Sequence, residues 1–278
     1  MKHAALALIA LCALATSQGK KKDWLPGQGI DWKGDWDAAV EEAAARNVPI
    51  HLAALMDNCP VCKAMSDSAF TDPRIIELSR SFVNVLAHNE TTHGDHDALV
   101  GKEKMKLCNE YATIPCSLHR KGWSAVGKFI NGTFVAPMTL FADPAGKEIG
   151  KAEGGLSAND LLKKMNDMLA KVPGDHIPST LWQTARRLVS DTDAWLAKGE
   201  PRKAAECLVK LAKMKGAPIK AIADEVAERA NEAGRKALQA ALALGADEEK
   251  KKALRKVVDD YRPLEVSAEA KKELDAIK

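Results

Sequence analysis

The sequence predicts an α/β domain built in layers, followed by an all-α region. In the first half, short apolar runs of strand length alternate with amphipathic helical patterns, an order typical of a sheet covered by helices. From Pro178 onward, apolar residues recur only at helical spacing. The chain has 278 residues, of which 46% are hydrophobic, which is long enough for two domains with separate cores.

A leader segment precedes the predicted fold. Lys2 and His3 are followed by an apolar run from Ala4 to Ala15, which ends in small residues that fit a cleavage site. This pattern is typical of a secretory signal peptide, and the run is too short to span a bilayer as an ordinary helix. We assign residues 1–17 to the signal and expect a secreted or periplasmic protein, without membrane insertion after the signal is removed.

The charge balance favours no polyanionic partner. A formal net charge of +3 is close to neutral for a chain of this length. The sequence contains neither a glycine-rich phosphate-binding loop nor a dinucleotide fingerprint. We therefore expect no nucleic-acid binding.

The elements of the α/β domain, placed at 18–174, follow from apolar spacing and capping residues. Asp35 is a suitable N-cap for a helix over Trp36–Arg46, and residues 48–55 form an apolar run of strand length. The remaining predicted elements are a cysteine-bearing helix to about Ser68, a helix over Arg74–Arg80, a strand over Phe82–Leu86, a strand over Pro137–Phe141, a turn at Asp143–Gly146, a strand over Glu148–Lys151 and a helix capped by Ser157.

Residues at about 88–134 form an extended insert with a less regular pattern. We predict a helix from about Asp97 to Tyr111. The following segment, 113–134, contains Pro115 and several glycines, and we predict a loop with short strands there.

The helical region is placed at 175–278. Its predicted helices are Thr180–Lys198, Pro201–Met214, Ile219–Leu244, Asp247–Tyr261 and Ser267–Ile277. A break of the third helix near Gly234 is an alternative to one continuous helix. Two stretches echo each other, since Leu196, Gly199 and Leu208 recur at Leu242, Gly245 and Leu254. A helical bundle and a helical-repeat array both fit this pattern.

Cys59-Pro60-Val61-Cys62 lies where the first long strand gives way to a helix. Two cysteines three residues apart on a first helical turn share one face and can form a disulfide with little backbone movement. Cys59 would stand at the helix N-terminus, where unpaired N–H groups and the helix dipole favour a thiolate. A partly exposed thiol of low pKa beside a second cysteine performs thiol–disulfide exchange.

The predicted reaction is a dithiol mechanism. Cys59 is the attacking thiol, Cys62 resolves the mixed disulfide, and Lys63 adds a cation that lowers a thiol pKa. The reaction needs no cofactor, because the disulfide itself carries the electrons. The alternative is a redox-inactive binding scaffold in which the same disulfide is a permanent staple.

The other cysteines after the leader leave several pairings open. The simplest assignment pairs Cys59 with Cys62 and Cys108 with Cys116, and leaves Cys207 as a buried small hydrophobe in a helix. In this assignment Cys108 and Cys116 form a structural clip on a long loop. A second redox pair that passes electrons to the first is the other interpretation.

A histidine group follows the second strand. His88, His93 and His96 lie close together in the sequence, with Asp95 among them, and these side chains are able to bind zinc or copper. Their spacing matches no tight ligand signature, so we assign no metal ligand. A periplasmic protein that handles soft metals through these histidines and the Cys59–Cys62 pair is a third functional hypothesis.

Over residues 31–172 the chain resembles the thioredoxin superfamily, and more narrowly its exported thioredoxin-like members. The matching residues are Trp36-Asp37-Ala38-Ala39, Asn47-Val48-Pro49-Ile50, Cys59-Pro60-Val61-Cys62, Ala69-Phe70-Thr71-Asp72-Pro73, Phe82-Val83-Asn84-Val85 and Ala136-Pro137-Met138-Thr139-Leu140-Phe141-Ala142-Asp143 with Gly146. The resemblance implies disulfide exchange with protein substrates that carry thiols or disulfides. The helical region lies outside this resemblance, and our hypothesis is that it binds a protein partner or positions substrates.

In that family the proline before the fourth core strand is cis, packs against the disulfide and shapes the surface where the substrate backbone docks. Carried over, this residue is Pro137, with Pro115 as a rival position. The sequence departs from the family at Asn58, where many members have an aromatic residue, and in the Pro-Val pair between the cysteines. Because those residues tune the redox potential, the resemblance does not indicate whether the protein oxidises or reduces its substrates.

Overall fold

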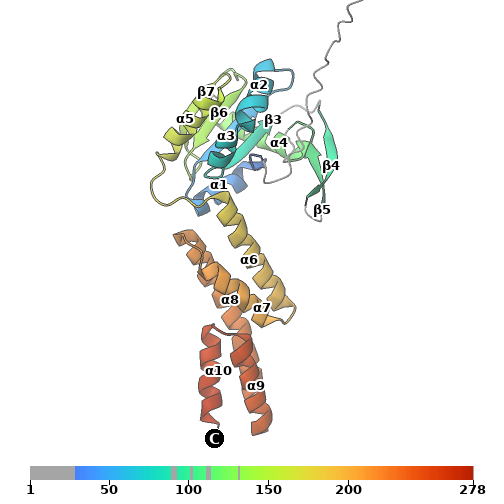
Figure 1. Ribbon diagram of the computed structural model, residues 1–278, viewed down its shortest axis with the longest axis vertical. Helices are drawn as coiled ribbons and strands as arrows, with labels where there is room; N and C mark the ends of the chain where they lie inside the picture. The colour runs from blue at the N-terminus through green and yellow to red at the C-terminus, as the bar shows by residue number, and fades with distance from the viewer. Residues whose placement is uncertain (1–28, 89–92, 101–102, 111–113, 131, 278) are drawn as a thin grey trace, which may run out of the picture.

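The structure is a computed structural model that describes residues 29–88, 93–100, 103–110, 114–130 and 132–277. The predicted signal segment, residues 1–17, lies outside the described residues. An α/β domain stands at one end of the molecule, and the helices of the second region extend away from it (Figure 1). This arrangement agrees with the predicted fold class.

The central sheet has five strands in the order β1-β3-β2-β6-β7. Their bounds are β1 Trp32–Lys33, β2 Ile50–Leu55, β3 Val83–His88, β6 Met138–Ala142 and β7 Glu148–Glu153. The first three are mutually parallel, whereas β6 runs antiparallel to β2 and β7 antiparallel to β6. Strand β2 is buried along its whole length, because helices cover both faces of the sheet.

Helices pack on the two faces of this sheet in separate layers. Helix α1 (Trp36–Arg46) lies on one face, and helices α2 (Pro60–Ser68), α3 (Pro73–Ser79) and α5 (Ala158–Leu169) lie on the other. The carboxylate of Asp35 accepts hydrogen bonds from the first backbone N–H groups of α1, and the Ser157 hydroxyl does the same for α5. Both caps are as the sequence predicts.

The helix predicted over Asp97–Tyr111 is wrong. This segment forms a hairpin of β4 (Asp95–Val100) and β5 (Glu103–Cys108), which make a two-stranded sheet of their own. Its lysines, glutamate and methionine favour a helix only weakly, and tertiary contacts override such a preference. Among the hairpin side chains whose burial is described, only Leu107 and Cys108 are buried, so little apolar surface holds the hairpin to the domain.

The loop with short strands predicted over 113–134 is also wrong. Helix α4 (Cys116–Gly122) and the 3₁₀ helix η2 (Trp123–Lys128) occupy most of the segment that is described. Cys116, His119 and Gly122 form the buried face of α4. Gly122 permits this packing, because a Cβ atom there would lie 2.3 Å from the carbonyl oxygen of Leu86 in the sheet.

The second region consists of five helices among the described residues. They are α6 Ser179–Ala197, α7 Pro201–Ala212, α8 Ala217–Leu242, α9 Asp247–Asp260 and α10 Glu265–Ala276. Helix α8 is continuous through Gly234, so the predicted alternative of a break there is wrong. The missing side chain at Gly234 leaves room for Val266 and Tyr261 to pack against the helix. One apolar cluster joins α6, α7 and the start of α8, and another joins the end of α8 with α9 and α10.

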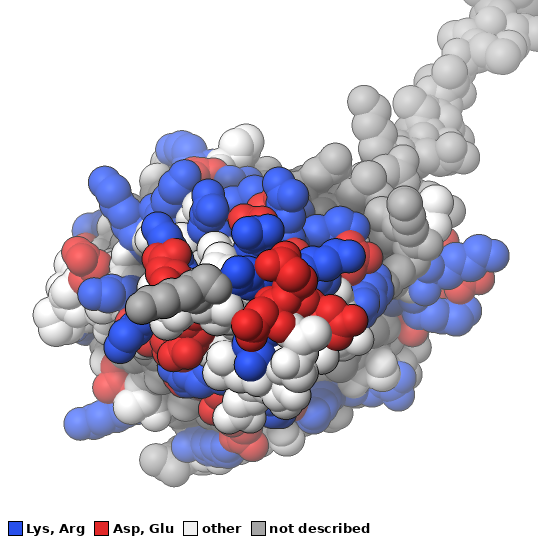
Figure 2. Space-filling model, turned by 90° about the horizontal axis from the view of Figure 1, so that it is seen from below, with Lys and Arg blue, Asp and Glu red and all other residues white. Residues whose placement is uncertain are grey.

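The face of the molecule seen from its helical end is mixed in charge. In Figure 2, lysine and arginine side chains are interspersed with aspartate and glutamate over the face that is shown. In the part of the chain that the structure describes, no helix is both long and apolar enough to pass through a bilayer.

A buried histidine lies in the centre of the sheet. His51 of β2 is fully buried and stacks on Phe141, with 5.3 Å between the ring centroids. The amide nitrogen of Asn84 donates to the carbonyl oxygen of Ser79, so the amide oxygen faces His51 and accepts from its Nδ1 at 3.1 Å. Burial lowers the pKa of His51 to about 4, which keeps the ring neutral.

This histidine should make the folded state sensitive to acid. Because its pKa is near 6.5 in the unfolded chain and about 4 in the fold, the unfolded state binds more protons between these values. The contribution of His51 to the free energy of unfolding is fully present well above pH 6.5 and decreases as the pH falls. At pH 5 the loss from this group alone is about 2 kcal/mol. Urea unfolding at pH 8 and pH 5 should show this loss, and the loss should shrink by that amount in His51→Gln. An equal acid dependence in both proteins would contradict the prediction.

Candidate functional site

Cys59 and Cys62 lie at the start of helix α2, directly after the loop that follows β2. They form a disulfide, with 5.2 Å between their Cα atoms. Cys59 is the N-cap residue, and its sulfur accepts a hydrogen bond from the backbone N–H of Cys62 at 3.1 Å. Pro60 occupies the first helical position, where its missing N–H leaves no intrahelical bond unmade.

The two cysteine residues differ in their exposure to solvent. Cys59 is partly exposed, whereas Cys62 is 2% exposed and belongs to the apolar cluster between α2 and the sheet. A backbone donor and the positive end of the helix both stabilise negative charge on the Cys59 sulfur. The geometry thus makes Cys59 the accessible sulfur of the pair and Cys62 the sheltered one.

The Lys63 side chain lines the same pocket as Cys59 and has a carboxylate partner of its own. Its ammonium group pairs with Asp67 at 3.1 Å, one turn further along the exposed side of α2, and this pairing raises the pKa of Lys63. Asp67 therefore holds the ammonium group of Lys63 over the exposed surface of α2. The helix terminus is the better-supported source of thiolate stabilisation.

Asn58 explains one departure from the resembled family. Its φ angle is 56°, which lies in the left-handed region. Asparagine adopts this region more readily than an aromatic residue does. The turn that presents Cys59 therefore favours asparagine at this position.

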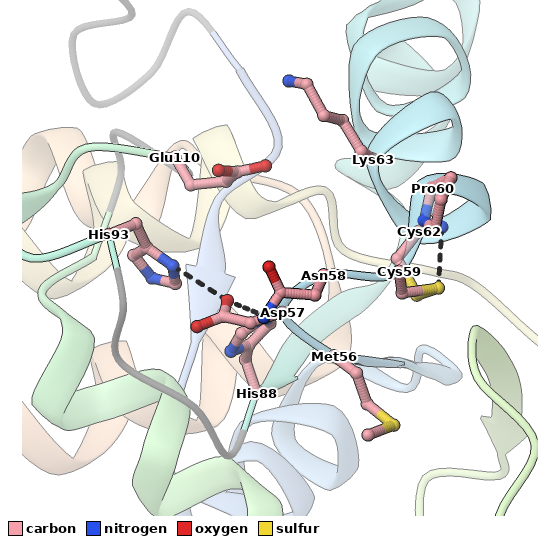
Figure 3. A pocket seen from close by; sticks show the side chains of 10 residues that line it. All are labelled: Met56, Asp57, Asn58, Cys59, Pro60, Cys62, Lys63, His88, His93 and Glu110. Atoms are coloured by element: carbon pink, nitrogen blue, oxygen red, sulfur yellow. Dashed lines mark hydrogen bonds and ion pairs between the residues drawn. A yellow bond between two sulfur atoms is a disulfide. The ribbon is translucent and has the colours of Figure 1, made fainter.

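A pocket of about 450 Å³ borders the cysteine pair. Its lining residues are Met56, Asp57, Asn58, Cys59, Pro60, Cys62, Lys63, His88, His93 and Glu110 (Figure 3). The pocket lies between the start of α2 and two residues that flank the β4–β5 hairpin, His93 and Glu110. It joins the predicted redox pair to the histidine group in one site.

Asp57 is the centre of the polar side of this pocket. Its Oδ1 atom lies 3.1 Å from His93 Nδ1 and 3.1 Å from His88 Nε2 (Figure 3). The Asp57 side chain is 7% exposed, so these contacts are largely shielded from water. The hydrogen bond with Cys108 and the charges of Cys108 and Asp57 raise the pKa of His93 to about 9.

The predicted histidine group is only partly assembled. His88 and His93 lie together, with 5.1 Å between their ring centroids, whereas His96 is exposed and its Nδ1 faces the Asn109 side chain. The residue that completes the group is His119 of α4, whose Nε2 lies 3.2 Å from His93 Nε2. Sequence reasoning missed His119, although Cys116 and His119 have the Cys-x-x-His spacing of a ligand pair.

The Cys108–Cys116 disulfide is not formed, so that part of the predicted pairing is wrong. Both residues are buried beside the two histidines. His93, Cys108, Cys116 and His119 each place one ligand atom within 4.8 Å of the others. Cys207 is buried in α7, as expected, and burial raises the pKa of its thiol.

Pro137 lies at the start of β6, and the Ala136–Pro137 peptide bond is cis. Pro115, the rival position, is instead the N-cap of α4. The carbonyl oxygen of Pro137 accepts from the N–H of Gly154, and the neighbouring Gly155 lies against the side chain of Val61. These contacts bring Pro137 to the same end of the domain as the cysteine pair.

Comparison with known proteins identifies the first domain. A family model described as a thioredoxin-like domain matches residues 36–169. A thioredoxin from Thermus thermophilus is 18% identical, over 51% of this chain and 89% of that chain, with a TM-score of 0.35. An uncharacterized thioredoxin-like protein from Clostridium perfringens is 16% identical, over 59% of this chain and 98% of that chain, with a TM-score of 0.31. No curated protein matches the sequence.

Proposed function

Because residues 36–169 form a domain of the thioredoxin superfamily, we propose that this protein is an exported thiol–disulfide oxidoreductase that acts on protein thiols and disulfides. The observation that carries the proposal is the position of Cys59, a partly exposed residue at the N-cap of α2 whose sulfur accepts the N–H of Cys62. Such a sulfur is a good nucleophile and a good leaving group.

In one direction, the reaction is the reduction of a client disulfide by the Cys59–Cys62 dithiol. The Cys59 thiolate attacks one sulfur of a client disulfide, which forms a mixed disulfide and releases the other client sulfur as a thiolate. The Cys62 thiolate then attacks Cys59, which releases the second client thiol and leaves the Cys59–Cys62 disulfide. Two electrons pass to the client, and the reverse sequence oxidises a client dithiol.

The surface around Cys59 suits a polypeptide substrate. Met56 is 38% exposed and Val61 is 49% exposed, so apolar side chains flank the accessible sulfur. Pro137 and Gly154 lie at the same end of the domain, and the cis proline is proposed to position the extended backbone of the client. The helical region lies on the far side of the domain from α2 (Figure 1), and we assign it the binding of a protein partner.

The closest competing function is a scaffold that keeps the Cys59–Cys62 disulfide permanently. A redox titration against glutathione, with the thiols counted by mass spectrometry, separates the two. For an oxidoreductase we expect a potential between about −270 and −120 mV, the range of thioredoxin-fold exchange proteins. A pair that stays oxidised below about −300 mV would instead identify a structural disulfide and overturn the proposed activity. Cys207→Ser is the matched control, because this buried thiol lies outside the pocket.

A further inference from the structure

The insert between β3 and β6 gathers two cysteines and two histidines at one point. His93 precedes β4, Cys108 ends β5, and Cys116 and His119 lie on the first turn of α4. Cys108, Cys116 and His119 are buried, and the His93 side chain is 10% exposed. One ligand atom from each residue lies within 4.8 Å of the other three.

The hydrogen bonds of the two histidines direct the same ring atom into this cluster. His93 Nδ1 lies 3.1 Å from the Asp57 carboxylate, and His119 Nδ1 lies 3.0 Å from the main-chain carbonyl oxygen of His88. Both partners are acceptors, so each Nδ1 carries a hydrogen and donates it. The pKa of His93 is raised to about 9, so without a metal its Nε2 also carries a proton. Metal binding would displace that proton, and each Nε2 would then present a lone pair to the cluster.

These two lone pairs face each other, since the Nε2 atoms are 3.2 Å apart. Two acceptor nitrogens cannot bond to one another, so a shared cation is needed between them: a proton or a metal ion. Two imidazoles bound to one tetrahedral zinc ion at about 2.0–2.1 Å would have their nitrogens about 3.3 Å apart. The observed separation fits that geometry.

The two cysteine sulfur atoms complete a set of four ligands that is typical of zinc sites. Cys108 Sγ accepts the backbone N–H of Glu110 at 3.3 Å, which supports a thiolate. Cys116 Sγ donates to the Gly94 carbonyl oxygen at 3.2 Å as a thiol, and this proton would leave to solvent on metal binding. Two thiolates and two imidazoles in a buried tetrahedral site are typical of structural zinc.

We propose that His93, Cys108, Cys116 and His119 form a four-ligand zinc site that holds the β4–β5 hairpin and α4 against the redox domain. Asp57 is the outer partner that orients His93, as carboxylates do beside many metal-bound histidines. The hairpin has its own two-stranded sheet and few buried side chains, so it lacks the apolar contacts that would hold it by packing alone. Neither Cys59 nor Cys62 belongs to this site.

The test is the metal content of the full-length protein, purified with a thiol reductant and then loaded with ZnCl₂ and desalted. We expect one equivalent of zinc in the wild type and in Cys207→Ser. We also expect one equivalent in the double variant Cys59→Ser/Cys62→Ser, and its loss from Cys108→Ser and from Cys116→Ser. No stoichiometric zinc in the wild type, or loss of zinc only when Cys59 and Cys62 are replaced, would overturn the proposal.

Two measurements keep the test decisive if the cysteine variants fail to fold. X-ray absorption of the zinc-loaded wild type should show two sulfur ligands at about 2.3 Å and two nitrogen ligands at about 2.0–2.1 Å. A first shell of oxygen atoms, or of four sulfurs, would contradict the assigned ligands. In a competition titration, Asp57→Asn should bind zinc about 10–100-fold more weakly, and an unchanged affinity would remove Asp57 from the site.

Discussion

Replacing Cys59 with serine should abolish disulfide exchange with a peptide substrate that carries a disulfide or a dithiol. A serine hydroxyl at the same N-cap position keeps the helix start but cannot form a disulfide, so both steps of the reaction are lost. Loss of an essential nucleophile removes several orders of magnitude of rate. Turnover should therefore fall to the rate of the uncatalysed reaction, measured by fluorescence of a labelled peptide.

Cys62→Ser provides the contrasting result. Cys59 can still attack a client disulfide, but no second thiol remains to release the client, so a covalent complex should accumulate. This complex should appear on a non-reducing gel and disappear with dithiothreitol. It should be missing in Cys59→Ser/Cys62→Ser and unaffected by Cys207→Ser. An adduct that forms in Cys59→Ser and not in Cys62→Ser would reverse the two roles.

Replacing Arg46 with methionine should destabilise the fold by about 3–5 kcal/mol, the cost of breaking a buried charged network. Arg46 is 1% exposed at the end of α1 and pairs with Glu42 at 2.7 Å. Its guanidinium also donates to the carbonyl oxygens of Phe82, Arg80 and Ile177. Methionine fills part of the same volume but supplies no donor for these groups.

This loss should be measured as a lower urea midpoint of unfolding, followed by tryptophan fluorescence. Arg46→Lys should recover only part of the stability, because one ammonium group cannot reproduce the planar fork of donors. The exposed Arg74→Met is the matched control and should leave the midpoint nearly unchanged. Equal midpoints for Arg46→Met and Arg74→Met would show that the network contributes little. Because Arg46 also contacts Ile177, the variant should loosen the connection between the two regions.

The cysteine pair and most of the sheet can be predicted from the sequence, because they depend on residues that are neighbours along the chain. Asp35 and Ser157 cap helices where the sequence places caps, and the pattern at 48–55 predicts β2. The Cys59–Cys62 spacing and Pro60 predict the helix start that the structure shows. In each case the residues that decide the structure are neighbours along the chain.

The insert is where sequence reasoning fails. The lysine-rich segment 97–111 has helical composition, yet pairing of β4 with β5 and burial of Cys108 produce a hairpin. Sequence spacing groups His96 with His88 and His93, whereas in the structure His119 lies beside them and His96 faces Asn109. The cysteine spacing favours a disulfide between Cys108 and Cys116, whereas both thiols face histidines instead.

The position of Cys59 at the start of α2 follows from the amino-acid sequence alone, since a cap, a proline and a second cysteine act within one helical turn. By contrast, His93 and His119 are 26 positions apart, and they meet two cysteine sulfurs through the three-dimensional packing of the insert. The same packing places the Asp57 carboxylate against His93 across 36 positions. Such contacts depend on how the hairpin and α4 dock on the sheet, and that docking is set by distant partners rather than by local preference.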